Sequence, residues 1–230
     1  ESDNGLPIVN FFMHPELFLL LGISLSLGFT PGPNNAVASF SGFNFGIRKT
    51  IPLILGVWLG YTTFVVLTNF VLISTFIRYP IIQEIIRILG TFFLIYLAYK
   101  ISFSSLSKED KKVNPIKFID TFIFQFLNPK GVMAGITLIS KFVLEDDYLN
   151  SSFTVVAVCS LTALTSITTW TFLGKFLRKF ATNNDFIKRF NYAMSLLIIV
   201  CIIGSTSKIN ETGNKNSYKS LKTISIDNSD

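Results

Sequence analysis

Six long apolar runs, separated by short polar segments, limit what this chain can fold into more than any other feature. The runs lie at roughly 16–40, 51–77, 80–103, 118–142, 152–174 and 189–206. Each is close to the ~20 residues that an α-helix needs to cross ~30 Å of hydrocarbon. Half of the 230 residues are hydrophobic and only 15% are charged, which is too apolar for a soluble domain of this size. The sequence therefore predicts an integral membrane protein.

The runs are expected to be helices and not the strands of a barrel. They are continuously apolar, whereas barrel strands alternate apolar and polar residues. In lipid, each backbone N–H and C=O needs a partner inside its own segment, which a helix supplies. We predict an all-α integral membrane protein with six transmembrane helices in a single membrane domain, 16–206. Residues 1–15 are expected to be an extramembrane segment because they lack the pattern of a signal peptide, and the polar tail 207–230 is expected to be disordered.

Positive charges predict the orientation of the helices, because Lys and Arg gather in cytoplasmic loops. With both termini outside, the opposite loops hold only Arg78 and Lys141. The cytoplasmic segments then hold Arg48, Lys49, Lys100, Lys108, Lys111, Lys112, Lys117, Lys175, Arg178, Lys179, Lys188 and Arg189. Lysines in the C-terminal tail weaken this asymmetry without reversing it. We therefore predict that both termini lie outside.

A charged linker, 104–117, divides the runs into two groups of three, which predicts repeat one at 16–103 and repeat two at 118–206. Because each half has an odd number of spans, halves of the same fold must be inverted relative to each other, as in many secondary transporters. The first run of each half is interrupted near its middle, by TPGPN at 30–34 and by NPKG at 128–131. Paired Gly and Pro interruptions at corresponding positions indicate the binding site of a transporter.

The two interruptions contain residue types that suit a binding site. Pro cannot continue a helix, but a cap residue followed by Pro is typical of a helix start. Asn128-Pro129 has this pattern, and the first break offers two such pairs. Each new half-helix turns free N–H groups and a positive dipole end toward the membrane centre, where a carboxylate is favoured. Lys130 adds a full charge, which is costly there unless it faces a cavity or a partner. The candidate substrate-binding residues are Pro31, Gly32, Pro33, Asn34, Asn35, Asn128, Pro129 and Lys130.

Other features of the helices have a simpler explanation. The alternative for the breaks themselves is a set of proline kinks that only shape packing. Gly56 and Gly60 lie one turn apart and are expected to serve helix packing, because small residues let helices approach closely. Trp58 and Tyr61 lie beside this pair. We expect them either to line a cavity or, as is more common for aromatic residues, to pack against other side chains. A coupling proton has three candidate carriers, among which the sequence does not choose: Asp120, Glu84 and Glu16.

The chain lacks the motifs of several other protein classes. It has no nucleophile triad, no HExxH zinc motif and no phosphate-cradling P-loop, so we expect no enzyme activity and no cofactor. Cys159 and Cys201 fall inside apolar runs and are expected to be small buried hydrophobes. With one histidine and no His/Cys/Asp cluster, a metal site has no support. Any transport must then draw on an ion gradient.

The segments LGFTPGPNN, FGIRK, LGVWLG, ILGTFFLIYLAYK and FIFQFLNPKG, in this order and spacing, resemble the LysE/RhtB family of amino-acid exporters. The resemblance covers nearly the whole chain from about 16 to 206. It implies a multi-pass permease of the bacterial inner membrane that exports amino acids, coupled to a proton or cation gradient. Its partners would be a small-molecule substrate and the lipid bilayer, with no nucleic acid, and a homodimer is compatible with it. The lack of an acidic residue at the membrane centre favours neutral over basic amino acids.

Two positions depart from the family's pattern. Thr121 stands where the family often has glycine, and Thr50 stands where it often has a small residue, which bears on helix packing and cavity width. Three rival functions stay open. A thiol-redox protein would need cysteines near both breaks, and a metal exporter would need soft or imidazole ligands in the helices. A non-transporting scaffold is the third.

Overall fold

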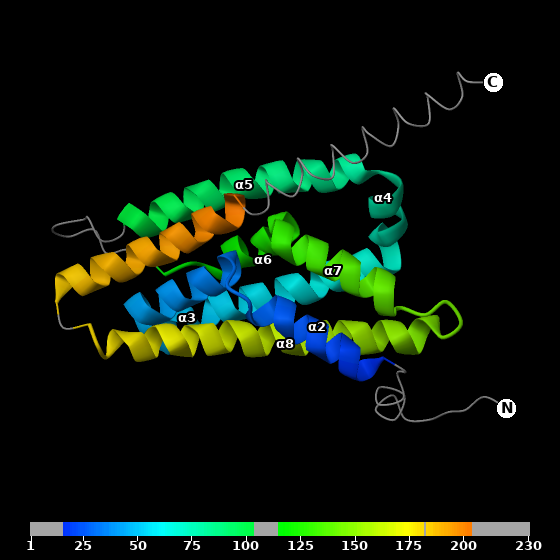
Figure 1. Ribbon diagram of the computed structural model, residues 1–230, viewed down its shortest axis with the longest axis horizontal. Coiled ribbons are helices and arrows are strands. Elements are labelled where there is room, and N and C mark those ends of the chain that lie inside the picture. The colour runs from blue at the N-terminus through cyan, green and yellow to red at the C-terminus, as the bar shows by residue number, and fades with distance from the viewer. Residues whose placement is uncertain (1–15, 104–114, 182, 204–230) are drawn as a thin grey trace, which may run out of the picture.

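The computed structural model describes residues 16–103, 115–181 and 183–203, and every regular element within these ranges is a helix (Figure 1). The all-helical prediction is confirmed for this part of the chain. The expected N-terminal segment 1–15, most of the linker and the tail 207–230 lie outside it. In chain order the elements are α2 (Leu17–Phe29), α3 (Pro33–Leu67), the π-helix η1 (Thr68–Leu72), α4 (Ile73–Arg78), α5 (Pro80–Phe103), α6 (Phe118–Leu127), α7 (Pro129–Phe142), α8 (Tyr148–Arg178) and a C-terminal helix (Asn184–Ile203).

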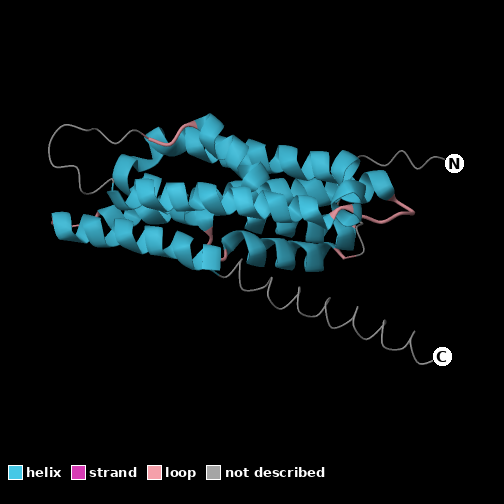
Figure 2. Cartoon of the chain, turned by 90° about the horizontal axis from the view of Figure 1, so that it is seen from above, coloured by secondary structure: helices cyan, strands magenta, loops and turns pink. Residues whose placement is uncertain are grey.

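The helices run roughly along the long axis of the molecule (Figure 2). By length and composition, four described helices are able to cross a membrane: Pro33–Leu72, Ile81–Tyr99, Tyr148–Arg178 and Asn184–Ile203. The pair α6 and α7, bent by 59° at its break, makes a fifth crossing if it is one span. α2, with 13 residues, is apolar but short. Six spans in two inverted repeats therefore stay a prediction.

The later helices extend beyond the apolar runs that predict them. α8 exceeds the run 152–174 at both ends, and the C-terminal helix begins at Asn184 instead of 189. Helical hydrogen bonds lie within the backbone, so polar residues continue the helix for about one more turn. The helices are longer than the apolar runs at these ends for that reason.

α3 contains a sharp turn at Gly46, whose φ of 76° and ψ of 172° are open essentially only to glycine. The exposed residues Arg48 and Lys49 follow directly after the turn. Residues 33–45 and residues 47–67 are therefore two separate helical stretches. In Figure 1, α2 and α6 approach the middle of the molecule from opposite ends, while α7 and the first part of α3 lead away from it.

Very close helix contacts hold the arrangement together. An added Cβ at Gly42 would overlap the carbonyl oxygen of Thr171 on α8, and one at Gly174 would overlap that of Ser39 on α3. At Gly60, the corresponding distance to the Phe122 carbonyl oxygen on α6 is 2.7 Å. Without a driving force from water, helices in a membrane gain their stability from such close packing. α3 is thus fixed between α8 and α6.

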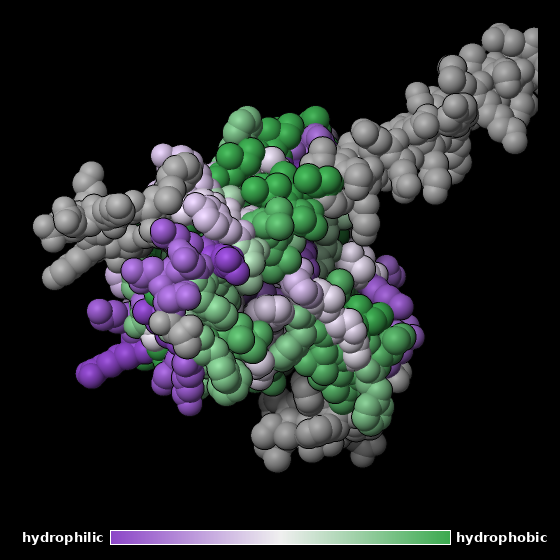
Figure 3. Space-filling model, turned by 60° about the vertical axis from the view of Figure 1, so that its left-hand side comes forward, coloured by the Kyte–Doolittle hydropathy of each residue, from purple (hydrophilic) through white to green (hydrophobic). Residues whose placement is uncertain are grey.

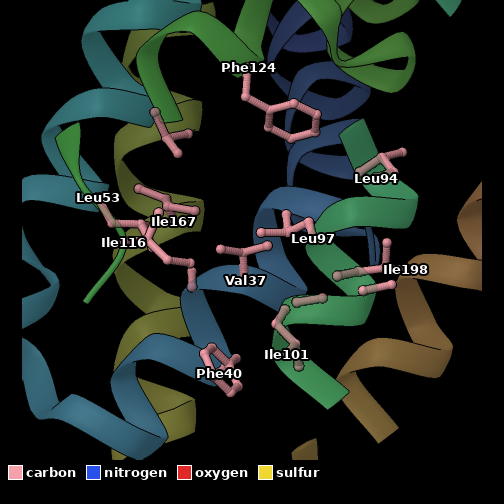
Figure 4. Packing of buried hydrophobic residues seen from close by; sticks show 14 of the residues in the cluster. Val37, Phe40, Leu53, Leu94, Leu97, Ile101, Ile116, Phe124, Ile167 and Ile198 are labelled. Atoms are coloured by element: carbon pink, nitrogen blue, oxygen red, sulfur yellow. The ribbon is translucent and has the colours of Figure 1, made fainter. Parts of the chain in front are cut away.

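Buried side chains form two apolar clusters. The cluster in Figure 4 joins α3, α5, α6 and the C-terminal helix, with Val37, Leu97 and Phe124 pointing toward one another. The other joins α2, α7, α8 and the second part of α3. Many large apolar side chains stay exposed on the outside, as expected for a surface that faces lipid. Figure 3 shows hydrophilic residues gathered on one side of the face in view, next to apolar surface.

Candidate functional site

The two helix breaks meet at a cavity of about 80 Å³, the central cavity, which is walled by α2, α3, α7 and α8. A buried water needs about 10–15 Å³ by this measure, so the central cavity has room for several heavy atoms. Pro31 and Pro129 do not line it; Pro31 is exposed and Pro129 is buried at the start of α7. The other predicted site residues do line it: Gly32, Pro33, Asn34, Asn35, Asn128 and Lys130.

Each break starts a helix with the expected pair of residues. Gly32 is the N-cap of α3 and Pro33 its first residue, so this is the pair that the first break uses. Asn128 is the N-cap of α7 and is followed by Pro129. Neither cap makes a side-chain hydrogen bond to its own helix. Two helix N-termini, one from each half of the chain, therefore border the same cavity with their positive dipole ends.

Lys130 links the second break to the first. Its Nζ donates to the backbone oxygen of Thr30 at 2.8 Å and to the Thr30 side-chain oxygen at 2.9 Å. Thr30 is the C-cap of α2, where the helix dipole is negative and attracts a cation. Among the described residues, Lys130 forms no ion pair. Its charge is therefore held by neutral oxygens alone and stays available to an anion.

The Lys130 side chain lies directly over the backbone of Gly32. A Cβ added at Gly32 would lie 2.8 Å from Nζ and 3.0 Å from Cδ of the lysine. The first break thus needs a residue without a side chain at this position, because any larger residue would displace the ammonium group. The backbone at Gly32 is extended, a conformation that every residue type is able to adopt. The contact with Lys130, and not the backbone conformation, therefore explains the glycine.

Asn34 and Gln125 form a reciprocal amide pair between the two halves of the chain. Asn34 Nδ2 donates to Gln125 Oε1 at 2.8 Å, and Gln125 Nε2 donates to Asn34 Oδ1 at 3.2 Å. Gln125 Nε2 also donates to the Thr121 carbonyl oxygen at 2.8 Å. Gln125 is fully buried, so these bonds satisfy an amide that would otherwise be costly to place there. We call this contact the amide pair.

Asn35 stabilises the end of α2. Its Nδ2 donates to the carbonyl oxygens of Gly28 and Thr30, each at 2.9 Å, which are among the carbonyls that a helix end leaves without partners. Ser166 on α8 donates to the same Gly28 oxygen at 2.8 Å. Asn35 therefore shapes the cavity by holding the break open, in addition to lining it.

Asn128 offers an acceptor inside the protein. Its side chain is only 3% exposed, and its Oδ1 has no hydrogen-bond partner among the described residues. Burying an amide oxygen without a partner costs roughly 1–3 kcal/mol. A ligand that carries N–H groups would remove this cost, and Asn128 lines the cavity where such a ligand would lie.

Several residues of the site were not selected from the sequence. Cys159 lines the central cavity, while Thr30 and Gln125 hold Lys130 and Asn34 in place. Tyr61, for which the sequence left a cavity wall and packing open, lines it as well. The small polar residues of α8 that line the cavity follow a helical spacing, which was the available signal: Cys159, Thr162 and Ser166. Gln125 had no comparable pattern.

The remaining candidates lie away from the central cavity. Gly56 and Gly60 face α6, where an added Cβ at Gly56 would overlap the Thr121 side chain. Glu84 and Arg87 form an ion pair on α5. Neither Asp120 nor Glu16 lines the cavity.

The comparisons with known proteins agree with a membrane translocator. The family described as LysE type translocator matches residues 25–204. The "Cysteine/O-acetylserine efflux protein" of Salmonella typhimurium (strain LT2) is 29% identical over 182 residues, which cover 78% of this chain and 92% of that protein. The protein of the same description from Escherichia coli (strain K12) is 27% identical over 183 residues, with the same coverage. No solved structure matches the chain.

Proposed function

The chain belongs to the LysE type translocator family, and on this basis we propose that it exports a small neutral amino acid across the bacterial inner membrane. One observation carries the proposal: two helix N-termini, one from each half of the chain, and a lysine without an ion pair among the described residues meet in one cavity. This arrangement favours a carboxylate, which every amino acid carries.

We assign six membrane crossings to the helices, in two inverted halves of three. In the first half, α2 and residues 33–45 form a broken span, and the turn at Gly46 leads to the second span. In the second half, α6 and α7 form the corresponding broken span. The two breaks fall at similar depths, after the 13 residues of α2 and the 10 residues of α6. The gathering of exposed Lys and Arg near the end of α8 supports a cytoplasmic position for that end.

The chemistry of the cavity supports a neutral amino acid as substrate. Lys130 and the helix N-termini suit the carboxylate, and the Asn128 oxygen suits the ammonium group. None of the described residues that line the cavity has a carboxylate, so none of them favours a second positive charge. The printed descriptions of the relatives, which name cysteine and O-acetylserine, support a substrate of this size and charge.

Transport would follow from competition for Lys130. In the empty site, Lys130 donates hydrogen bonds to Thr30, and these bonds join the start of α7 to the end of α2. A substrate carboxylate replaces these neutral acceptors, so α2 and α7 are free to separate. The two halves then rock to expose the site on the other side, driven by a proton or cation gradient.

Efflux from cells preloaded with single amino acids tests the proposal. The panel contains cysteine, O-acetylserine, threonine, leucine, lysine and arginine, each compared with a vector control. We expect faster efflux of the small neutral members and loss of this efflux in Lys130→Ala. Lys141→Ala is the matched control, because Lys141 is an exposed lysine in the last turn of the same helix. Equal efflux in vector, wild type and both variants, at normal membrane levels, would contradict the proposal.

A further inference from the structure

A second cavity, of about 90 Å³, lies beside the first and is walled by α3, α5, α6 and Ile116, which precedes α6. We call it the linker-side pocket, since Ile116 belongs to the charged linker 104–117. Most of its walls are apolar, and Figure 4 shows Val37, Leu97, Ile116 and Phe124 pointing into this region from three helices and the chain before α6. The central cavity and the linker-side pocket have Asn34 and Val57 in common. The two cavities therefore adjoin at Asn34.

The amide pair occupies the boundary between these cavities. Asn34 lines both of them, and both of its amide atoms are bonded to Gln125 on α6. The pair thus ties the first half of the chain to the second at the point where a molecule would pass from one cavity to the other. Because both partners are neutral, water or a substrate is able to replace each bond without leaving a buried charge.

The two cavities have opposite charges. Among the described residues, Asp120 is the only charged one that lines the linker-side pocket, and Lys130 is the only charged one that lines the central cavity. Asp120 is half-buried and forms no ion pair with another described residue. A zwitterion has one end that suits each site: an ammonium group for Asp120 and a carboxylate for Lys130.

We propose that the linker-side pocket is an access subsite that binds the ammonium group of the substrate through Asp120, with the amide pair as the barrier to the central cavity. This inference rests on the proposed function, since it assumes an amino-acid substrate. It adds a second binding position on one face of the membrane. Asp120→Asn, which keeps the size and hydrogen-bonding groups of the side chain, should then affect binding from that face alone.

Uptake into inside-out vesicles presents the substrate to the cytoplasmic face, and exchange uptake into right-side-out vesicles presents it to the outer face, so the two assays separate the faces. With cysteine or O-acetylserine, Asp120→Asn should raise KM about ten-fold on one face, as expected for loss of one charge-assisted hydrogen bond, and leave the other unchanged. The N-acetylated substrate, which lacks the ammonium charge, should compete poorly against wild type and better against the variant. Equal changes on both faces, or no change, would overturn the subsite.

A second measurement tests the barrier without relying on transport. Cys159 lines the central cavity, so its rate of labelling by a charged, membrane-impermeant thiol reagent reports access to that cavity in a Cys201→Ser background. Gln125→Met keeps the length of the side chain but removes the bonds to Asn34. We expect it to increase the labelling rate from the Asp120 face by about ten-fold, with no increase from the other face. Unchanged labelling in a monodisperse, correctly inserted variant would overturn the barrier.

The two inferences fail in different ways. If wild-type vesicles transport no member of the panel, the proposed function fails. If wild type transports but Asp120→Asn shows no difference between the faces, only the access subsite fails.

Discussion

Gly32→Ala tests how the position of Lys130 matters, because the substitution acts on the lysine without removing it. The added Cβ would lie 2.8 Å from Lys130 Nζ, whereas ordinary contacts lie at about 3.5–4.0 Å. The ammonium group must therefore retreat by about 0.7–1.2 Å. Its bonds to Thr30, now 2.8 and 2.9 Å long, would exceed normal hydrogen-bond length.

The cost of this change should appear in transport and not in folding. Loss of the bonds to Thr30 alone would favour the substrate, but the displaced ammonium group also leaves the position beside the start of α3 where the carboxylate would bind. Hydrogen bonds between two charged groups are stronger than those to neutral oxygens, so the net loss of affinity is about a factor of ten. The clash is with the end of a flexible side chain, and the extended backbone at Gly32 accepts alanine. We expect KM to rise at least about ten-fold and thermal stability in detergent to change by less than about 1 kcal/mol.

The assay measures efflux against internal substrate concentration in wild type, Gly32→Ala and Gly22→Ala, with thermal unfolding of each purified protein. Gly22 is the matched control, since nothing lies within 4 Å of a Cβ added there. A wild-type KM in Gly32→Ala would refute the reasoning that Lys130 must stand over Gly32 to bind the carboxylate.

Three further predictions concern the packing and backbone of the helices around the site. Gly42→Ala should destabilise the protein by about 3 kcal/mol or more in thermal unfolding, because the added Cβ meets the rigid backbone of Thr171; stability equal to wild type would disprove this contact. Gly46→Ala should cost about 1–3 kcal/mol through backbone strain alone, as its φ is 76° and no atom lies within 4 Å, while KM stays normal. Trp58→Phe removes the bond from Nε1 to Ser160 Oγ at 2.8 Å and should cost about 0.5–1.5 kcal/mol, whereas no loss would show that water replaces that bond.

The sequence was sufficient to predict the broken helices because their signals are local. Pro and Gly interrupt a helix wherever they occur, and the order of Asn128 and Pro129 specifies where the next helix begins. The family prediction is confirmed by the match over residues 25–204. These parts of the fold require no knowledge of which segments touch in space.

The contacts that complete the site could not be predicted in the same way. Thr30 and Lys130 are a hundred positions apart, and Asn34 and Gln125 are 91 apart. Thr30 and Gln125 lie within the segments TPGPN and FIFQFLNPKG, but these patterns do not say which residue each one meets. A glutamine in an apolar helix has many potential partners. Their roles depend on the packing of α2 against α7 and of α3 against α6, which a single sequence does not encode in its local pattern.

The same two contacts hold the two breaks side by side. Lys130 reaches Thr30 only if the start of α7 stands opposite the end of α2, and Gln125 reaches Asn34 only if α6 ends beside the start of α3. Each break therefore supplies the partner of a side chain on the other. A substrate that takes Lys130 from Thr30 weakens one of these links, while the amide pair still holds the other. Opening would then proceed one link at a time, so the cavity need not be open to both sides at once.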